Sequence, residues 1–352
     1  MTQDAHNWLA GDIGGTKTDL ALYSLDKGPR SPSSRRKYPS GDFPSLKDLI
    51  QRFLDEEGAS IAGASLGIAG PVVGKRVELT NLPWVVDAAE LEQIFGLADV
   101  QLFNDLVGLA QGIPQLPEES LRTLQEGHPD PRGPRAVIAP GTGLGQAYMI
   151  RDGDGYRAHA SEGGHADFAP ADDLEAELFR FLRGSYGHVS YERVASGRGL
   201  PNIYRFLKST GRAEEPEWLA RRLAEANDPT PVIVQTALDD SEPCGICAQT
   251  VRIFIEVLGR EAGNAALRVV ATGGVFLAGG IPPRILPLLE DERFINAFRD
   301  KGRLRDFMRR VPVKVVLESD VAIMGAACMG LKRLAELQGN GSEDQSCRNS
   351  KS

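Results

Sequence analysis

An α/β fold is predicted by two features of this 352-residue sequence: short apolar runs alternate with amphipathic segments, and several of the runs end in glycine-rich turns. Strands that alternate with helices favour a largely parallel sheet whose faces are covered by those helices. A glycine turn near the N-terminus recurs after a later strand, which indicates two related halves. The length favours about two domains.

The elements follow from hydrophobic periodicity and from turn residues. Two short strands, over 8–10 and 19–23, flank the first glycine turn, and 27–44 is predicted to be a surface loop because it is rich in Pro, Ser and Arg. Helices are expected over 45–57, 87–95, 172–183, 249–262 and 320–337, and strands over 61–68, 99–103, 136–139, 268–271 and 313–317. Several prolines within 112–135 mark a domain boundary. The polar segment 339–352 is predicted to be a disordered tail.

Composition excludes several classes of partner. The net charge is −8, which argues against non-specific binding to nucleic acid and to anionic membranes. No apolar run has the roughly 18 residues that a membrane span needs. The start, Met1-Thr2-Gln3-Asp4, lacks the basic and apolar parts of a signal peptide, so a cytoplasmic location is expected.

The cysteines raise the question of a metal. Cys244 and Cys247 have the spacing of half a zinc site or of a redox pair, but no second pair or nearby His completes four ligands. Ordinary reduced thiols are therefore the favoured interpretation, and no zinc is expected.

The most informative pair is Asn104-Asp105, where an apolar strand ends and a helix begins. Asn and Asp are good helix N-cap residues, so capping alone is one explanation. The ends of strands in α/β sheets are also where binding sites form, so chemistry is the other explanation.

The segment Gly11-Asp-Ile-Gly-Gly-Thr-Lys-Thr18 nearly matches a P-loop, but Thr16 replaces the second glycine and a strand, not a helix, follows. A glycine turn between two strands can still bind phosphate through consecutive backbone N–H groups. Asp12 beside it is a candidate for holding a hydrated Mg²⁺. A plain hairpin turn is the alternative.

Two further glycine-rich stretches could also bring bare backbone close to a nucleotide. Pro140-Gly-Thr-Gly-Leu-Gly145 has glycines where phosphates would approach, and with the first turn it suggests two strands that present turns to one nucleotide. Gly279-Gly280 precedes an expected helix and would let an adenosine lie against bare backbone; a helix-entry turn is the alternative.

A group of polar residues suits a ligand with many hydroxyl groups. Ser161-Glu162-Gly163-Gly164-His165 places a carboxylate and an imidazole in one turn, and Glu192 adds another carboxylate. Carboxylates, an amide and an imidazole can each pair with hydroxyl groups as donor or acceptor. A solvated helix residue is the alternative for Glu192.

Taken in order from Leu9 to Leu337, these motifs resemble the bacterial glucokinase family, a member of the superfamily of actin, hexokinase and the heat-shock ATPases. Asn81-Leu-Pro-Trp84 also resembles a family stretch near the sugar. Lys17-Thr18 is closer to the broader sugar-kinase group, whose cysteine-rich zinc motif is absent here.

The resemblance implies a two-domain actin-like, ribonuclease H-like ATPase fold with an interdomain cleft. The small domain would be 1–116 plus 318–338, and the large domain would be 117–317. The resemblance also implies a homodimer, and domains that close over the substrate to exclude water.

The implied reaction transfers the γ-phosphoryl group of ATP to the 6-hydroxyl of glucose, the first step of glycolysis. Asp105 would be the catalytic base, and Mg²⁺ would accompany the phosphates with Asp12 in its outer shell. The expected sugar contacts are Asn104, Asp105, Glu162, His165 and Glu192. The expected nucleotide contacts are Asp12, Gly14, Gly15, Thr16, Lys17, Gly141, Thr142, Gly143, Gly273, Gly279 and Gly280.

Two other functions are weighed against this one. A kinase for mannose, fructose or an N-acetylhexosamine would keep the same mechanism, and ADP or polyphosphate could replace ATP as donor. A non-catalytic sugar sensor is disfavoured, because about seven residues precede the first strand and leave no room for a DNA-binding segment, and because Asp105 is intact.

Overall fold

The computed structural model describes residues 7–70, 72–79, 82–239 and 241–349. The chain divides into two compact units: unit 1 is Met1–Pro117 with Glu318–Ser352, and unit 2 is Glu118–Leu317. The domain boundaries predicted from the sequence are 116/117 and 317/318. The two units meet at 117/118 and 317/318, so the predicted and observed boundaries differ by at most one residue. Each unit combines a sheet with helices, so the predicted α/β class is confirmed.

Unit 1 is built on a five-stranded sheet in the order β3-β2-β1-β4-β7. The strands are β1 (Trp8–Ile13), β2 (Lys17–Tyr23), β3 (Ser34–Pro39), β4 (Gly63–Ile68) and β7 (Asp99–Asn104). β2 is antiparallel to β1 and β3, whereas β1, β4 and β7 are parallel. A small hairpin joins β5 (Arg76–Glu78) to β6 (Val85–Asp87), and the helices are α1 (Leu46–Glu57), α2 (Ala88–Phe95), α3 (Asp105–Gly112) and α12 (Val321–Asn349).

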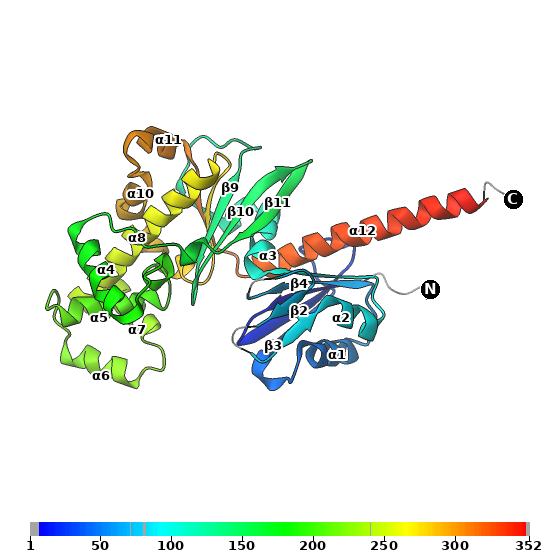
Figure 1. Cartoon of the computed structure of the whole chain (residues 1–352), viewed down its shortest axis with the longest axis horizontal. Helices are drawn as coiled ribbons and strands as arrows, with labels where there is room; N and C mark the ends of the chain where they lie inside the picture. The colour runs from blue at the N-terminus through cyan, green and yellow to red at the C-terminus, as the bar shows by residue number, and fades with distance from the viewer. Residues whose placement is uncertain (1–6, 71, 80–81, 240, 350–352) are drawn as a thin grey trace. The chain divides into compact units, whose positions relative to one another are not determined.

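Helices cover both faces of this sheet, because the apolar side chains of its central strand, β1, point alternately to one face and to the other. Leu9 and Ile13 of β1 face the core that contains α1 and α2, whereas Trp8 and Ala10 face the core under α12. All four side chains are 0% exposed. Figure 1 shows α1 and α2 on one side of the sheet and α12 on the other.

Glycines let α3 and α12 pack backbone against backbone. A Cβ at Gly325 would lie 1.8 Å from the carbonyl oxygen of Gly108, and a Cβ at Gly112 would lie 2.1 Å from the carbonyl oxygen of Val321. These separations are far below van der Waals contact, so only glycine fits at either position. The contact fixes where α3 lies, and α3 begins at Asp105.

Unit 2 is built on a six-stranded sheet in the order β11-β10-β9-β12-β13-β8. The strands are β8 (Leu121–Gln125), β9 (Arg135–Pro140), β10 (Leu144–Asp152), β11 (Gly155–Ser161), β12 (Gly274–Leu277) and β13 (Val313–Val316). The helices are α4 (Asp173–Tyr186), α5 (Gly199–Ser209), α6 (Glu217–Glu225), α7 (Pro229–Leu238), α8 (Gly245–Val269), α9 (Leu286–Leu289), α10 (Glu292–Arg299) and α11 (Arg305–Arg310). α8 is the central helix, since it contacts β9, α5, α7 and α10 (Figure 1).

The two sheets share one plan, in line with the recurring glycine turn. In each, three consecutive strands are antiparallel neighbours, β1-β2-β3 in unit 1 and β9-β10-β11 in unit 2, and the first strand of each trio also pairs in parallel with a later strand, β4 in unit 1 and β12 in unit 2. Each glycine turn therefore joins the first and second strands of such a trio, β1 to β2 in unit 1 and β9 to β10 in unit 2. The sequence predicts this equivalence correctly.

Four expectations about local structure are corrected. The loop predicted over 27–44 contains the edge strand β3, and the proline-rich stretch 112–135 contains β8. The strand predicted over 268–271 is the end of α8, and the true strand, β12, starts later at Gly274. α12 continues to Asn349 through most of the segment predicted to be disordered, because 342–349 contains no glycine or proline to stop it. Residues 350–352 lie outside the described ranges.

Candidate functional site

The first glycine turn is a closed hairpin between β1 and β2. The N–H of Gly14 donates to the carbonyl oxygen of Lys17 at 3.0 Å. Ser40 holds the turn from outside: its N–H donates to the carbonyl oxygen of Thr16 at 3.0 Å, and its hydroxyl donates to the carbonyl oxygen of Gly14 at 2.8 Å. The turn is therefore a β-hairpin whose carbonyl side is fixed by Ser40, a residue that the sequence did not single out. Phosphate binding by this turn stays a prediction.

Asp12 lies at the end of β1 among other carboxylates. It is paired in register with Asp19 on β2 and with Gly67 on β4. Burial, then the charge of Asp105, then that of Asp19 raise the pKa of Asp12 to about 6, while Arg35 opposes the shift. The Asp12 carboxyl is thus a place where added positive charge is favourable.

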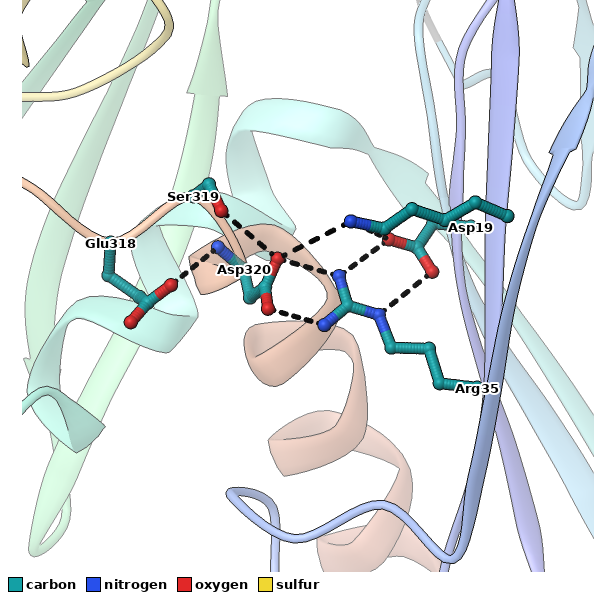
Figure 2. Close-up of polar contacts among 6 residues, drawn as sticks. Asp19, Arg35, Glu318, Ser319 and Asp320 are labelled. Carbon is teal, nitrogen blue, oxygen red and sulfur yellow. Dashed lines mark hydrogen bonds and ion pairs between the residues drawn. The ribbon is translucent and has the colours of Figure 1, made fainter.

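Figure 2 shows how the neighbouring carboxylate, Asp19, is neutralised. Arg35 donates from Nε to Asp19 Oδ1 at 3.0 Å and from Nη2 to Asp19 Oδ2 at 2.7 Å. The same guanidinium donates from Nη2 to Asp320 Oδ1 at 2.6 Å, and from Nη1 to the other oxygen of Asp320. This pairing lowers the pKa of Asp320 to about 2 and joins β2 and β3 to the residue that precedes α12.

Asn104 and Asp105 stand where β7 passes into α3. Asn104 is the N-cap: its Oδ1 accepts from the N–H of Leu106 at 3.0 Å, and its Nδ2 donates to the carbonyl oxygen of Gly70 at 3.1 Å. Asp105 is the first residue of the helix, and its Oδ1 accepts from the same N–H at 2.9 Å. The capping explanation for Asn104 is confirmed. The partial positive charge at a helix N-terminus favours the ionised form of Asp105.

In unit 2, the second glycine turn joins β9 to β10 and is bonded to Glu192. The N–H of Gly141 donates to the carbonyl oxygen of Gly143 at 2.9 Å. Glu192 Oε2 accepts from the N–H of Leu144 at 3.0 Å, and a Cβ at Gly143 would lie 2.5 Å from that oxygen. The solvated-helix explanation for Glu192 is wrong, because its half-buried carboxylate is held by the turn.

The Glu162–His165 segment is packed on the same turn. A Cβ at Gly164 would lie 2.0 Å from the carbonyl oxygen of Leu144, and a Cβ at Gly163 would lie 2.3 Å from Gln146 Oε1. The flanking side chains remain open to solvent, with Glu162 67% and His165 60% exposed. The backbone of this segment is fixed while its two polar side chains stay available to a ligand.

Two glycines predicted to contact the nucleotide, Gly273 and Gly279, lie at opposite ends of β12. At the carboxyl end, a Cβ at Gly279 would lie 2.9 Å from the carbonyl oxygen of Pro140, which immediately precedes the second turn. At the amino end, the N–H of Gly273 donates to the carbonyl oxygen of Pro134 at 2.9 Å. The structure therefore does not bring Gly273 to the second turn. The mistaken strand over 268–271 had placed Gly273 after a strand instead of before one.

A cavity of ≈ 1000 Å³ opens beside the second turn, all within unit 2. Its wall includes Gly141 and Thr142 of the turn, Gly280 and Ile281 after β12, and the segment 227–231 that leads into α7. Two basic side chains, Arg198 and Arg284, also line it. The 227–231 segment and both arginines carried no signal in the sequence, since only the fold brings them to the glycines.

The predicted residues thus fall into two groups. Unit 1 brings together Asp12, Asn104 and Asp105 with the turn Gly14–Lys17. Unit 2 brings together the second turn, Glu192, the Glu162–His165 segment and Gly279–Gly280.

Comparison with known proteins decides the family. The family model described as Glucokinase matches residues 9–333. The glucokinase of Nostoc punctiforme is 39% identical over 333 residues, which cover 91% of this chain and 97% of that protein. The chain belongs to the glucokinase family. The predicted recognition of the bacterial family is confirmed.

Solved glucokinase structures are similar in fold to this chain. Glucokinase from an Antarctic psychrotroph superposes with a TM-score of 0.77 and 31% identity, over 92% of this chain and 98% of that one. A ROK family glucokinase from Streptomyces griseus, solved in complex with glucose and AMPPNP, gives a TM-score of 0.60 at 22% identity, over 93% and 99% of the two chains. The predicted two-domain actin-like fold is confirmed for this member of the glucokinase family.

Metal and membrane features complete the description of this family member. Over the described ranges, no three His, Cys, Asp or Glu side chains gather so that they could hold a metal ion. Cys244 and Cys247 are buried free thiols. Among the helices that the structure describes, none is both long and apolar enough to span a membrane.

Proposed function

We propose that this member of the glucokinase family transfers the γ-phosphoryl group of ATP to the 6-hydroxyl of D-glucose, giving glucose 6-phosphate and ADP. The observation that carries the proposal is the bond between Glu192 and Leu144, which joins a predicted sugar contact to a predicted phosphate turn. The cavity beside that turn supports the nucleotide part, because ≈ 1000 Å³ is at the upper end of the usual size of ligand pockets.

The nucleotide would lie against the glycines of that cavity. Gly141, Thr142 and Gly280 present backbone where adenosine and phosphates need close approach. Arg198 and Arg284 supply positive charge near the phosphates. In unit 1, Gly14–Lys17 would hold phosphate as the equivalent turn of the other sheet.

Asp105 would act as the general base. It lies on the first turn of α3, where the partial positive charge of the helix N-terminus stabilises a negative charge. It would accept the proton of the 6-hydroxyl as that oxygen attacks the γ-phosphorus and ADP departs. Most of the remaining catalysis would come from positioning and charge stabilisation, as is usual for phosphoryl transfer.

The sugar would be oriented by Asn104, Glu162, His165 and Glu192. The Glu162 and His165 side chains, with Oε2 and Nε2 3.9 Å apart, are both more than half exposed and could pair with hydroxyl groups. Asn104 keeps a second amide hydrogen and a second oxygen lone pair beyond its two structural bonds. Glu192 keeps its second oxygen beyond the bond to Leu144.

Mg²⁺ would accompany the phosphates, and Asp12 fits a place in its outer shell. The pKa of Asp12 is raised to about 6 by burial and by nearby carboxylates, so a cation beside it is favourable. Mg²⁺ needs only one or two protein carboxylates because it keeps waters and phosphate oxygens as ligands. When bound, it would neutralise phosphate charge. The proposal extends to a homodimer that acts in the cytoplasm at the start of glycolysis.

An assay of ADP release with Mg·ATP tests the reaction. Glucose, mannose, fructose and N-acetylglucosamine are compared at equal concentration. The proposal expects glucose to give the highest kcat/KM. Higher turnover with another of these sugars would change the substrate, and glucose binding without turnover of any sugar would favour a sensor.

A further inference from the structure

Glu261, in the middle of α8, carries a carboxylate although it is 0% exposed. A buried carboxylate is costly unless hydrogen bonds and opposite charge compensate it. Three donors do so here: Gln146 Nε2 at 2.8 Å, Asn264 Nδ2 at 2.9 Å and Arg268 Nη1 at 2.7 Å. Such a satisfied network fixes the orientation of each side chain in it.

The first branch of the network leads to the Glu162–His165 segment. A carboxylate only accepts hydrogen bonds, so Gln146 turns its nitrogen toward Glu261 and its Oε1 away from it. That oxygen lies where a Cβ at Gly163 would be only 2.3 Å away. Ser161 Oγ accepts from the N–H of Gly163 at 3.1 Å and so fixes the backbone of the same glycine. Glu261 thereby sets, through one amide, the position of the turn.

The second branch leads to Glu192. Asn264 Nδ2, already bonded to Glu261, also donates to the hydroxyl of Tyr191 at 3.0 Å. Tyr191 is 3% exposed and directly precedes Glu192. Its N–H donates to the carbonyl oxygen of Ala166 at 3.0 Å, which joins this branch to the residue after His165.

We propose that Glu261 is a positioning residue for the sugar: from inside α8 it holds both the Glu162–His165 turn and Glu192 in the orientation that glucose requires. The inference rests on the proposed function, in which those residues contact glucose. No part of Glu261 reaches the ligand, since Gln146 and the Asn264–Tyr191 pair lie between. Both branches end beside predicted sugar contacts, at Gly163 next to Glu162 and at Tyr191 next to Glu192, whereas a core ion pair with a purely structural role would have no such connection.

Glu261→Gln is the test variant because it keeps the shape and removes the charge that orients both amides. We expect kcat/KM for glucose to fall by on the order of 10- to 100-fold through misplaced contacts, with KM for ATP within about twofold of the wild-type value. Thr250→Val is the matched control: Thr250 is a fully buried residue of the same helix that bonds only within it, to the carbonyl oxygen of Ile246. The control should lower the melting temperature without changing KM for glucose.

Tyr191→Phe completes a double-mutant cycle and also serves if Glu261→Gln does not fold. It removes the hydroxyl that Asn264 reaches, and we expect it to raise KM for glucose and to be non-additive with Glu261→Gln. Unchanged glucose kinetics in both single variants, or strictly additive effects in the cycle, would overturn the inference. A wild-type chain that binds Mg·ATP but does not phosphorylate glucose would contradict the proposed function itself, and the inference with it.

Discussion

Glu192 and Gly143 share one small space: the carboxylate oxygen that accepts the N–H of Leu144 lies 2.5 Å from where a Cβ at residue 143 would stand. A side chain at 143 would therefore have to push the Glu192 carboxylate aside, apart from any effect on a phosphate. The predicted sugar contact and the predicted phosphate turn are built as one structure, so a change in one must move the other.

Gly143→Ala should accordingly displace the Glu192 carboxylate. We expect kcat/KM for glucose to fall by on the order of 10- to 100-fold, because a shift of about 1 Å in a positioned group has that effect. Gly184→Ala, in α4 and with open space around its Cβ position, is the control for a glycine-to-alanine change. Steady-state kinetics with varied glucose measure both, and wild-type kinetics for Gly143→Ala would show that Glu192 does not depend on the turn.

Gly325→Val tests the close packing of α12 against α3, the helix that begins at Asp105. The added side chain would meet the carbonyl oxygen of Gly108, since even a Cβ would be 1.8 Å from it. We expect a loss of more than about 3 kcal/mol in the free energy of unfolding, as overpacking against backbone is costly. Urea unfolding measures it, with Gly339→Ala in the same helix as a control whose Cβ has open space. Equal stability of the two variants would contradict the packing described for α3.

Gly280→Val tests the nucleotide cavity without disturbing the fold. A Cβ at Gly280 meets nothing within 4 Å, so the substitution should be tolerated structurally. The new side chain would occupy the cavity wall, and we expect KM for ATP to rise about tenfold or more, the loss of roughly 1.4 kcal/mol of binding. KM for glucose should change little. If KM for ATP is unchanged while the melting temperature is also unchanged, the nucleotide does not lie in this cavity.

Asp12→Asn should lower the activity and raise the free energy of unfolding, and the gain in stability should depend on pH. The pKa of Asp12 in the folded chain is about 6, above its ordinary value of 3.8, so its contribution to the free energy of unfolding is present below pH 3.8 and is lost as pH rises through about 6. The neutral Asn loses nothing over that range. We expect the variant to gain on the order of 1–3 kcal/mol relative to the wild type between pH 4 and pH 7.5.

The measurement for Asp12→Asn is urea unfolding at both pH values without nucleotide or Mg²⁺. The same variant should lose activity with Mg·ATP, because the negative charge beside the cation is gone. A variant that is less stable than the wild type by the same amount at pH 4 and pH 7.5 would show that the Asp12 carboxyl is not destabilised by its neighbours.

The sequence predicts the glycine turns and the polar strand ends well, because both depend on local backbone rules. Asn104 caps α3, and each turn joins two antiparallel strands, as residue types at those positions require. It fails at Val269-Val270-Ala271, whose apolar run has the composition of a strand. Val269 instead ends α8, and Val270 is its C-cap in the left-handed region at φ 52°, a conformation that a β-branched residue rarely adopts.

Contacts distant in the sequence account for the rest of what was missed. Ser40 reaches the first turn from a position 26 residues after Gly14, and Glu261 reaches Gln146 across 115 residues. The cavity wall at 227–231 is brought to Gly141 only by the packing of α7 beside α8. No local pattern encodes these pairings, because each depends on the assembled core.

The most direct measurement is the kinetics of Asp105→Ala with glucose and Mg·ATP. We expect the wild-type chain to release ADP in a glucose-dependent reaction. In the variant, kcat should fall by on the order of 10²–10⁴, while the affinity for ATP and the melting temperature stay close to the wild-type values. Normal turnover by Asp105→Ala would contradict the assignment of the base, and a wild-type chain without glucose-dependent ADP release would contradict the proposed function.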